Sequence, residues 1–338
     1  MLISENVLLK PYNTFGITAA ARFFGTFASL QDLESGLADQ RVIGRPRMIL
    51  GGGSNILFTQ NYNGAMLKNE IKGISVVAED NDYVYVKAGA GENWHGFVQY
   101  CIGRNLAGLE NLSLIPGNVG ASPMQNIGAY GVEIKDCFHE LEAYHLEDKQ
   151  LVTFNNADCK FGYRESVFKH QYKNQFAIIS VTYKLSKTPH FNTSYGAIEA
   201  ELEHMGVKEL SIRAISDAVI NIRSSKLPNP AEIGNAGSFF KNPSVDGATY
   251  RRLKDSFPGI VAYPLPDDHF KLAAGWLIEQ CGWKGYREGD AGVHAKQSLV
   301  LVNYGNAKGS EIYHLSQQVV DSVQEKFGVT LEREVNII

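Results

Sequence analysis

The 338-residue sequence lacks the features that mark several large classes of protein. It has no block of basic residues and a net charge of −4, which argues against a nucleic-acid partner, because such proteins carry concentrated Lys/Arg surfaces. No apolar run is long enough to span a bilayer. The N-terminus has no basic start followed by an apolar segment, so we expect neither a signal peptide nor a membrane partner.

Three common sequence motifs are also missing. There is no G-x-G-x-x-G dinucleotide fingerprint and no G-x-x-x-x-G-K-[ST] phosphate loop, so Rossmann and P-loop folds lose their main support. The G-x-S-x-G nucleophile motif is absent as well, which weakens a hydrolase interpretation.

Cysteine is scarce. The four cysteines, Cys101, Cys137, Cys159 and Cys281, form no C-x-x-C pair and have no histidine at metal-ligand spacing. We therefore expect reduced, buried thiols, with no disulfide framework and no metal site, in a reducing compartment. The protein should be cytoplasmic, and its length predicts two or three domains.

Glycine is plentiful, and it is concentrated in loops. The central loop, residues 114–131, contains four glycines, two prolines and almost no charge. Its small residues permit close approach of the backbone to a ligand, which suits a phosphate held by amides rather than by lysines. An irregular connection between strands is the alternative interpretation of this stretch alone. The neutral hydrogen-bonding side chains of this loop are Ser122, Gln125 and Asn126.

A second loop of the same character precedes the central loop. Residues 51–55, Gly-Gly-Gly-Ser-Asn, follow a strand that we expect over residues 41–50. One polyanion held by two backbone-rich loops is the simplest interpretation. A further strand over residues 83–86 leads into Gly89-Ala90-Gly91.

Apolar periodicity predicts the scaffold around these loops. Trp94, Phe97, Val98 and Cys101 recur at helical spacing, so Trp94 is expected in the core. Other helices are expected around residues 215–222, around residues 272–281, and from Ser310 as N-cap to Gly328 as its stop. Strands are expected over residues 176–183, within residues 298–304, and over residues 329–338. The last has Val329, Leu331, Val335 and Ile337 on one face and Glu332 and Glu334 on the other.

Two polar stretches stand out as candidate sites. Arg164, between aromatics in residues 161–166, is either an ordinary surface charge or a guanidinium that meets a carboxylate in two places, and the pattern leaves both open. The loop 234–243 combines glycines with Ser238, and Lys226 and Lys241 lie close in sequence. Ser238 either takes part in the chemistry through its hydroxyl or is a small residue that lets Phe239 and Phe240 pack.

Taken together, these stretches resemble the UDP-N-acetylenolpyruvoylglucosamine reductase family, flavoenzymes of bacterial cell-wall precursor synthesis. Several long motifs in the right order are more specific than any one of them. The resemblance runs through essentially the whole chain, in residues 51–55, 89–94, 108–131, 161–166, 226–228, 234–243, 271–277 and 331–335.

The resemblance implies an α+β fold with an FAD-binding domain of the vanillyl-alcohol-oxidase type (PCMH-type). Two α+β subdomains, residues 1–67 and 68–212, would make that domain, and residues 213–338 would form a smaller α+β substrate domain. It further implies a monomer with non-covalent FAD and with NADPH and a UDP-sugar as substrates. The stretch around Tyr195 is similar to the longer variant of the family, in which a tyrosine loop closes over the substrate.

The resemblance also implies roles for individual residues. FAD would take hydride from NADPH and pass it to the enolpyruvyl double bond, in ping-pong fashion. Arg164 and Glu334 would position and polarise the substrate carboxylate, and Ser238 would give a proton to the adjacent carbon. The expected cofactor-binding residues are Gly51, Gly52, Gly53, Ser54, Asn55, Gly117, Gly120, Ser122, Pro123, Gln125, Asn126, Gly128 and Arg223. The expected substrate-binding residues are Tyr163, Tyr195, Lys226, Asn242, Tyr263 and Lys271.

Two rival functions remain. One is a different flavin oxidoreductase that oxidises an alcohol with oxygen. Some proteins of that kind attach flavin through His or Cys near the first glycine loop, and residues 51–55 contain neither. The other is a nucleotide-binding protein without catalysis, against which the Ser238 and Arg164 motifs argue.

Overall fold

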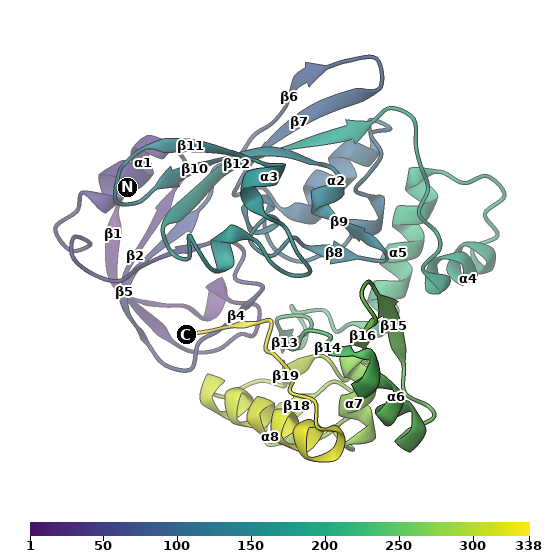
Figure 1. The fold of residues 1–338 in the computed structure, drawn as a ribbon. Helices are drawn as coiled ribbons and strands as arrows, with labels where there is room; N and C mark the ends of the chain where they lie inside the picture. Colours follow the sequence, from purple (N-terminus) through teal and green to yellow (C-terminus); the bar gives the residue numbers. More distant parts are fainter. The chain divides into compact units, whose positions relative to one another are not determined.

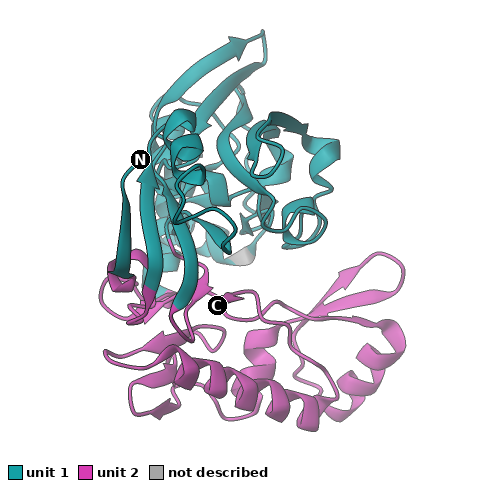
Figure 2. Ribbon diagram, turned by 90° about the vertical axis from the view of Figure 1, so that its left-hand side faces the viewer, with its two compact units in different colours: residues 1–7, 21–52, 62–225 teal, residues 8–20, 53–61, 226–338 magenta. Residues whose placement is uncertain are grey.

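The computed structural model describes residues 1–195 and 197–338 and divides into two compact units (Figures 1 and 2). Unit 1 comprises residues 1–7, 21–52 and 62–225. Unit 2 comprises residues 8–20, 53–61 and 226–338. Unit 2 therefore combines two short N-terminal segments with the C-terminal third of the chain. The division at residues 67 and 212 into three consecutive segments stays a prediction.

The first sheet of unit 1 has the strand order β1-β2-β5-β3, in which β2 and β3 both run parallel to β5. Parallel strands need a crossover, and helix α1 lies in the connection from β2 to β3. The Ser29 hydroxyl starts this helix by accepting the N–H of Asp32. The bounds are β1 Ile3–Leu8, β2 Ala20–Phe27, α1 Leu30–Leu37, β3 Arg47–Leu50 and β5 Tyr62–Asn69.

Strand β3 is shorter than the expected strand over residues 41–50. Residues 40–45 form turns instead, because the Asp39 carboxylate accepts both the N–H and the guanidinium of Arg41. Gly44, with φ +71°, continues the turn, and Pro46 has no N–H to give to a sheet. Only the last four residues of the predicted strand are therefore extended and paired.

The second sheet of unit 1 is antiparallel, with the order β11-β10-β12-β7-β6. Helix α2 packs against it: Trp94 and Phe97 are buried, and their ring centroids lie 5.8 and 5.0 Å from that of Tyr183 in β12. The predicted helix at Trp94 and the strands at residues 83–86 and 176–183 are confirmed. The bounds are β6 Ile74–Glu79, β7 Tyr83–Gly89, α2 Trp94–Ile102, β10 Phe138–His145, β11 Leu151–Asn155 and β12 Phe176–Ser186.

The rest of unit 1 consists of short elements and one helical pair. Helices α4 and α5 form a small core of their own, to which α5 gives Ile215, Ala218, Val219 and Ile222, so the helix expected around residues 215–222 is confirmed. The remaining bounds are β8 Gly128–Ala129, β9 Val132–Glu133, α3 Asn156–Cys159, α4 Gly196–His204 and α5 Ile212–Lys226. Single 3₁₀ turns occupy Glu110–Leu112, Val119–Ala121, Ile134–Asp136 and Val167–Lys169.

Unit 2 contains sheets of order β13-β19-β18-β17 and β14-β16-β15, and the parallel pair β20-β4. Its long helix α8 buries Ile312, Leu315, Val319, Val323 and Phe327. The bounds are β4 Ile56–Leu57, β13 Gly234–Asn235, β14 Ser244–Asp246, α6 Gly247–Ser256, β15 Ala262–Leu265, β16 His269–Leu272, α7 Ala274–Gln280, β17 Arg287–Glu288, β18 Ala291–Val293, β19 Leu301–Asn303, α8 Gly309–Phe327 and β20 Asn336–Ile337, with a 3₁₀ turn at Lys10–Tyr12.

Several boundaries in unit 2 differ from the predictions. The N-cap of α8 is Lys308 rather than Ser310, because the Glu311 carboxylate reaches back to the Lys308 N–H. Gly328, with φ +68°, ends the helix as expected. Helix α7 begins at Ala274, since Leu272 is still paired with Ala262 in the sheet.

The strand predicted within residues 298–304 is confirmed, whereas the last predicted strand is shorter than expected. The strand within residues 298–304 is β19, and in residues 329–338 only β20 is a strand. Val329, Leu331 and Val335 are nevertheless buried, as the alternation predicts. Among the described residues, no helix is both long and apolar enough to cross a membrane.

Candidate functional site

The glycine loops of unit 1 meet in space. A Cβ built on Gly52 would lie 3.0 Å from the Cα of Gly117 and 3.0 Å from Oδ1 of Asn118. The first loop and the central loop are therefore in direct contact, as the two-loop interpretation requires. Only a residue without a side chain permits this approach.

A third glycine loop, residues 89–93, follows strand β7 and hydrogen-bonds the central loop. Val119 and Gly120 donate their N–H groups to the carbonyls of Glu92 and Ala90, each at 2.9 Å. Asn118 donates its side-chain amide to Gly91 at 3.2 Å. The three loops thus form one cradle, which we define as residues 51–52, 89–93 and 117–122.

The backbone amides of the cradle are not equally available. Those from Val119 to Ser122 donate to protein carbonyls: the first two to the 89–93 loop, and Ala121 and Ser122 within the 3₁₀ turn. The N–H groups of Gly52 and Gly53 have no acceptor among the described residues. Amides suited to an anion therefore lie in the first loop, whereas the central loop mainly provides close approach. The expectation had both loops contribute amides, whereas the Val119–Ser122 amides of the central loop are already used.

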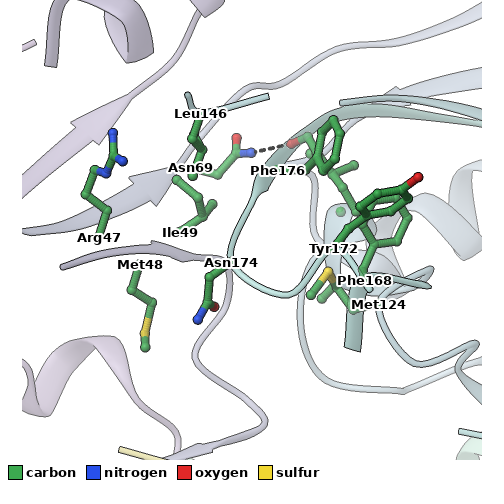
Figure 3. Close-up of a pocket in the computed structure, with 15 residues that line it drawn as sticks. Arg47, Met48, Ile49, Asn69, Met124, Leu146, Phe168, Tyr172, Asn174 and Phe176 are labelled. Carbon is green, nitrogen blue, oxygen red and sulfur yellow. Dashed lines mark hydrogen bonds between the residues drawn. The ribbon is translucent and has the colours of Figure 1, made fainter. Parts of the chain in front are cut away.

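A cavity of unit 1 opens beside the cradle (Figure 3). Gly51, Gly120 and Ala121 form its cradle side. Arg47 and Asn174 add polar groups, and Arg47 pairs with Glu147. Its apolar walls come from both sheets and the loops between them: Met48, Ile49, Met124, Leu146, Phe168, Phe176 and Ile178.

Two of the predicted side-chain donors of the central loop, Ser122 and Asn126, hydrogen-bond protein atoms. The Ser122 hydroxyl is buried and lies 2.6 Å from the hydroxyl of Tyr183. Asn126 is fully buried, and its side chain hydrogen-bonds Glu133, the carbonyl of Gly162 and the N–H of Lys135. Pro123 is buried and Gln125 half-buried. Ser122 and Asn126 thus support the loop through protein contacts, and the expected role of all four residues in cofactor binding stays a prediction.

Gly120 and Gly128 are tightly enclosed by protein. A Cβ on Gly120 would lie 2.6 Å from the Cβ of Ala90. One on Gly128 would lie 2.8 Å from Cγ of Glu133 and 3.3 Å from NH1 of Arg164. Substitution at Gly120 therefore disturbs the cradle, whereas substitution at Gly128 disturbs Arg164.

Arg164 is held rather than free on the surface. It is half-buried, its backbone is left-handed with φ +56°, and its guanidinium donates to the carbonyl of Gly128 at 2.8 Å. Tyr163 beside it is 37% exposed, with its ring 5.8 Å from the Arg164 guanidinium carbon. The structure thus favours a fixed guanidinium over a solvated charge.

Arg223 lies at the other end of the central loop. Its Nε–H donates to the carbonyl of Leu114 at 3.1 Å, while Nδ1 of His95 accepts the N–H of the same residue at 2.9 Å. Leu114 has φ +58°, so two side chains hold a strained residue. Burial lowers the pKa of His95, and the Arg223 charge adds to this, which keeps the imidazole neutral as an acceptor. Sequence reasoning missed His95 because it appears there as an ordinary helix residue.

Tyr195 packs on Tyr130, the residue near the end of the central loop. Their ring centroids are 5.4 Å apart in an edge-to-face arrangement, and Tyr195 is 47% exposed. Burial raises the pKa of the Tyr130 hydroxyl, and the nearby Arg223 charge opposes this. The tyrosine segment and the central loop are therefore joined within unit 1.

In unit 2, Ser238 lies on a firmly held loop. Gly237, with φ +71°, turns the chain, and a Cβ there would meet nothing within 4 Å, so the backbone angle alone calls for glycine. Ser238 is exposed, whereas Phe239 and Phe240 behind it are fully buried. The serine therefore faces out from the side opposite to the aromatic packing, which is compatible with both interpretations of its role.

Glu334 lies next to this loop. Its N–H donates to the carbonyl of Phe239 at 2.8 Å, and Lys241 donates its N–H to Glu332 at 2.9 Å. The Lys241 ammonium, 7% exposed, pairs with the Glu332 carboxylate at 2.5 Å. Of the three expected catalytic residues, unit 2 thus brings Ser238 and Glu334 together, and Arg164 belongs to unit 1.

The C-terminus is fastened to the segment that follows the first glycine loop. Thr59 donates its N–H at 2.6 Å and its hydroxyl at 2.8 Å to the main-chain oxygen of Ile338. The carbonyl of Asn55 accepts from Asn336, and its side chain donates to the carbonyl of Glu334 at 3.4 Å. Gly53 packs on Tyr12, whose carbonyl would be 2.0 Å from an added Cβ. Ser54, which lies between Gly53 and Asn55 in the sequence, is half-buried.

The expected substrate-binding residues of unit 2 fall into two places. Tyr263 in β15 pairs directly with Lys271 in β16, so their side chains share one sheet face. The side-chain oxygen of Asn242 accepts the N–H of Ala274, which leaves its amide hydrogens for other partners. Lys226 is exposed at the end of α5.

The cradle fits the cofactor that the resemblance implies. A diphosphate needs unsatisfied amides and close backbone approach, which the first loop and Gly117 provide. A flat ring needs apolar walls, which the adjoining cavity provides. Neither loop contains a histidine or cysteine for covalent attachment. FAD held without a covalent bond is therefore compatible with these residues.

Comparison with known proteins agrees over the whole chain. Residues 26–155 match the model of an FAD binding domain, and residues 229–338 match that of the C-terminal domain of UDP-N-acetylenolpyruvoylglucosamine reductase. Reductases of that name from Pseudomonas putida and Flavobacterium johnsoniae are each 50% identical to the chain, over 98% and 100% of both sequences. The relative from Amoebophilus asiaticus is also 50% identical over the full length.

A solved structure supports the fold. The chain matches the UDP-N-acetylenolpyruvylglucosamine reductase of Thermus caldophilus with a TM-score of 0.69, 24% identity and 99% coverage of both chains. With the FAD-binding match, this confirms the fold class that the resemblance implied. The identity to full-length relatives shows that the chain belongs to the UDP-N-acetylenolpyruvoylglucosamine reductase family of flavin oxidoreductases.

Proposed function

We propose that the chain reduces the enolpyruvyl group of UDP-N-acetylglucosamine enolpyruvate to the lactyl ether, giving UDP-N-acetylmuramate at the expense of NADPH. The observation that carries the proposal is the arrangement in unit 2, where an exposed serine and a glutamate lie on adjacent, hydrogen-bonded backbones. FAD, when bound, accepts hydride from NADPH and passes it to the enolpyruvyl double bond.

The reaction needs a site for the substrate carboxylate and a proton donor. Arg164 binds the carboxylate, because a guanidinium matches its geometry and the hydrogen bond to Gly128 fixes its direction. Glu334 polarises the same group. The Ser238 hydroxyl gives its proton to the carbon next to the carboxylate, where negative charge accumulates as the terminal carbon receives hydride.

The remaining residues hold the two nucleotide ligands. Lys226 and Lys271 bring positive charge to the diphosphate of the sugar nucleotide, and Asn242, Tyr163, Tyr195 and Tyr263 contact its neutral parts. For the cofactor, Gly51, Gly52, Gly53, Ser54, Asn55 and Gly117 surround the diphosphate. Gly120, Ser122, Pro123, Gln125, Asn126, Gly128 and Arg223 fix the shape of the central loop.

The proposal also covers the partners and the oligomeric state of the protein. The small-molecule partners are the UDP-sugar and NADPH, and the protein acts as a monomer. The location in the cytoplasm and the absence of a nucleic-acid or membrane partner stay predictions from the sequence.

The decisive test is NADPH oxidation by the purified, FAD-loaded protein. We expect rapid oxidation that depends on the enolpyruvyl substrate and consumes one NADPH per product. Oxygen uptake with an alcohol, without need of the enolpyruvyl compound, would favour the alcohol-oxidising alternative. Tight binding of FAD and the sugar nucleotide with no turnover would favour a binding protein.

A further inference from the structure

The central loop and the turn that carries Arg164 are joined by hydrogen bonds at alternate positions. The Ser166 hydroxyl donates to the carbonyl of Met124 at 2.7 Å. Asn126 donates its side-chain amide to the carbonyl of Gly162 at 3.0 Å, and Arg164 donates to Gly128 at 2.8 Å. Positions 124, 126 and 128 of the loop therefore each hold one part of the segment 162–166.

Asn126 is the central member of this series, and all of its contacts are internal. It is 0% exposed, and its backbone is left-handed with φ +46°. Its second amide hydrogen goes to the Glu133 carboxylate at 2.9 Å, and its oxygen accepts the N–H of Lys135 at 3.1 Å. Both donors and one acceptor position are used, so the side chain is committed to protein partners.

The turn that Asn126 holds determines the direction of Arg164. Gly162 and Glu165 exchange two backbone hydrogen bonds, at 3.1 and 3.2 Å, so the two residues between them form a tight turn. Arg164 sits in this turn with φ +56°. Because the turn is closed by these two bonds, the Asn126 amide that holds the Gly162 carbonyl also holds the whole turn in place. The Arg164 guanidinium then reaches the Gly128 carbonyl from a defined position.

We propose that Asn126 is a positioning residue for Arg164. It acts by holding the 162–165 turn against the central loop, not by contacting cofactor or substrate. The inference rests on the proposed role of Arg164 at the substrate carboxylate. The Asn126 side chain would thus connect the central loop, which shapes the cofactor site, with Arg164, which meets the substrate.

The test is a double-mutant cycle on the two half-reactions, with Asn126→Gly and Arg164→Ala. Glycine is chosen because it adopts the left-handed backbone of position 126 without strain, so only the side-chain bonds are lost. In FAD-saturated Asn126→Gly we expect flavin reduction by NADPH at about the parent rate, because the side chain bonds only Glu133, Gly162 and Lys135. Reoxidation by the enolpyruvyl substrate should slow by about 10–100-fold, the scale of a small misplacement of a reacting group.

The cycle separates positioning from general damage. In the Arg164→Ala background, Asn126→Gly should slow reoxidation little further, because the residue that it positions is already gone. With both proteins saturated with FAD, equal effects of Asn126→Gly in both backgrounds overturn the positioning role and leave the proposed function intact. If Arg164→Ala reoxidises at the parent rate, the proposed function of Arg164 fails, and the inference with it.

The chain offers a matched control and a second variant. Asn156 is exposed and donates its side-chain amide to the carbonyl of Lys135 at 2.9 Å, so Asn156→Ala removes a similar bond at the same residue without touching the turn. Its half-reactions should match those of the parent. If Asn126→Gly fails to fold, Ser166→Ala cuts a different bond between the same segments. Non-additivity with Arg164→Ala is then expected, and additivity overturns the proposal.

Discussion

The backbone N–H of Glu334 donates to the carbonyl of Phe239 at 2.8 Å, so Glu334 is joined to the residue that follows Ser238. The two residues come from distant parts of the chain, and the bridge between Phe240 and Arg333 continues the contact. Arg333 is fixed in turn by Ser316 and Gln317 of α8, both at 2.8 Å. A helix therefore fixes the segment that carries Glu334.

Ser238→Ala should separate the two half-reactions. We expect FAD binding and flavin reduction by NADPH to stay nearly intact. Reoxidation by the enolpyruvyl substrate should fall by about 10²–10⁴-fold, the usual effect of losing a general acid. Stopped-flow absorbance measures both steps, and Ser238→Cys should recover part of the loss because a thiol also donates a proton. If both steps slow together, or neither slows, Ser238 is a packing residue.

Thr59→Val should loosen the C-terminus and, through it, Glu334. The substitution removes the hydroxyl that donates to the main-chain oxygen of Ile338, and we expect the free energy of unfolding to fall by about 1 kcal/mol. Amide exchange at Ile338 should accelerate, with a slower reoxidation step. Thr330→Val is the control, since its hydroxyl bonds Gln324 on the exposed side of the molecule. Unchanged exchange at Ile338 would show that strand β20 needs no help from Thr59.

Lys226→Ala should raise KM for the sugar nucleotide more than it lowers kcat. The ammonium is expected to meet the diphosphate equally in the ground and transition states, so its loss affects binding. A charge-assisted hydrogen bond predicts an increase of about tenfold or more. Lys208→Ala removes another exposed lysine and should change neither constant. A collapsed kcat at constant KM would contradict the binding role.

Acid should weaken the hold of His95 on the central loop. Its pKa is lowered in the folded protein by burial and by Arg223, so the unfolded chain binds this proton more readily. The stabilisation is present above the ordinary histidine pKa of about 6.5 and is lost as the pH falls through it towards the folded value.

The measurement is the free energy of unfolding from about pH 7 to about pH 5. We expect it to fall more steeply with acid in the parent than in His95→Gln, which keeps an acceptor for Leu114 but does not titrate. His314→Gln, on the exposed face of α8, should keep the parent slope. Equal slopes in all three proteins would rule out this role for His95.

Gly120→Val should release flavin before it unfolds the protein. The added Cβ would lie 2.6 Å from that of Ala90, so the central loop must move away from the loop at 89–93. FAD content should fall while far-ultraviolet circular dichroism stays unchanged. Gly96→Ala is the control, because a Cβ there meets nothing closer than 3.5 Å. Parallel loss of flavin and helical signal would make Gly120 a purely structural residue.

The sequence alone was enough for features that depend on neighbours along the chain. The apolar spacing of Trp94, Phe97 and Val98 placed α2, and Gly328 placed the end of α8. The glycine loops were recognisable because no regular helix or strand accommodates their composition. The motif order also indicated the family, which the full-length relatives confirm.

Contacts between distant segments were decided only by the tertiary structure. Nothing near Asn126 in sequence indicates that its amide holds the carbonyl of Gly162, or that the Val119–Ser122 amides are already used. Nothing near Ile338 indicates that Thr59 binds its main-chain oxygen. A side chain carries the same donors and acceptors whether it faces a ligand or the protein. The fold chooses between them, because burial brings partners together that the chain order keeps apart.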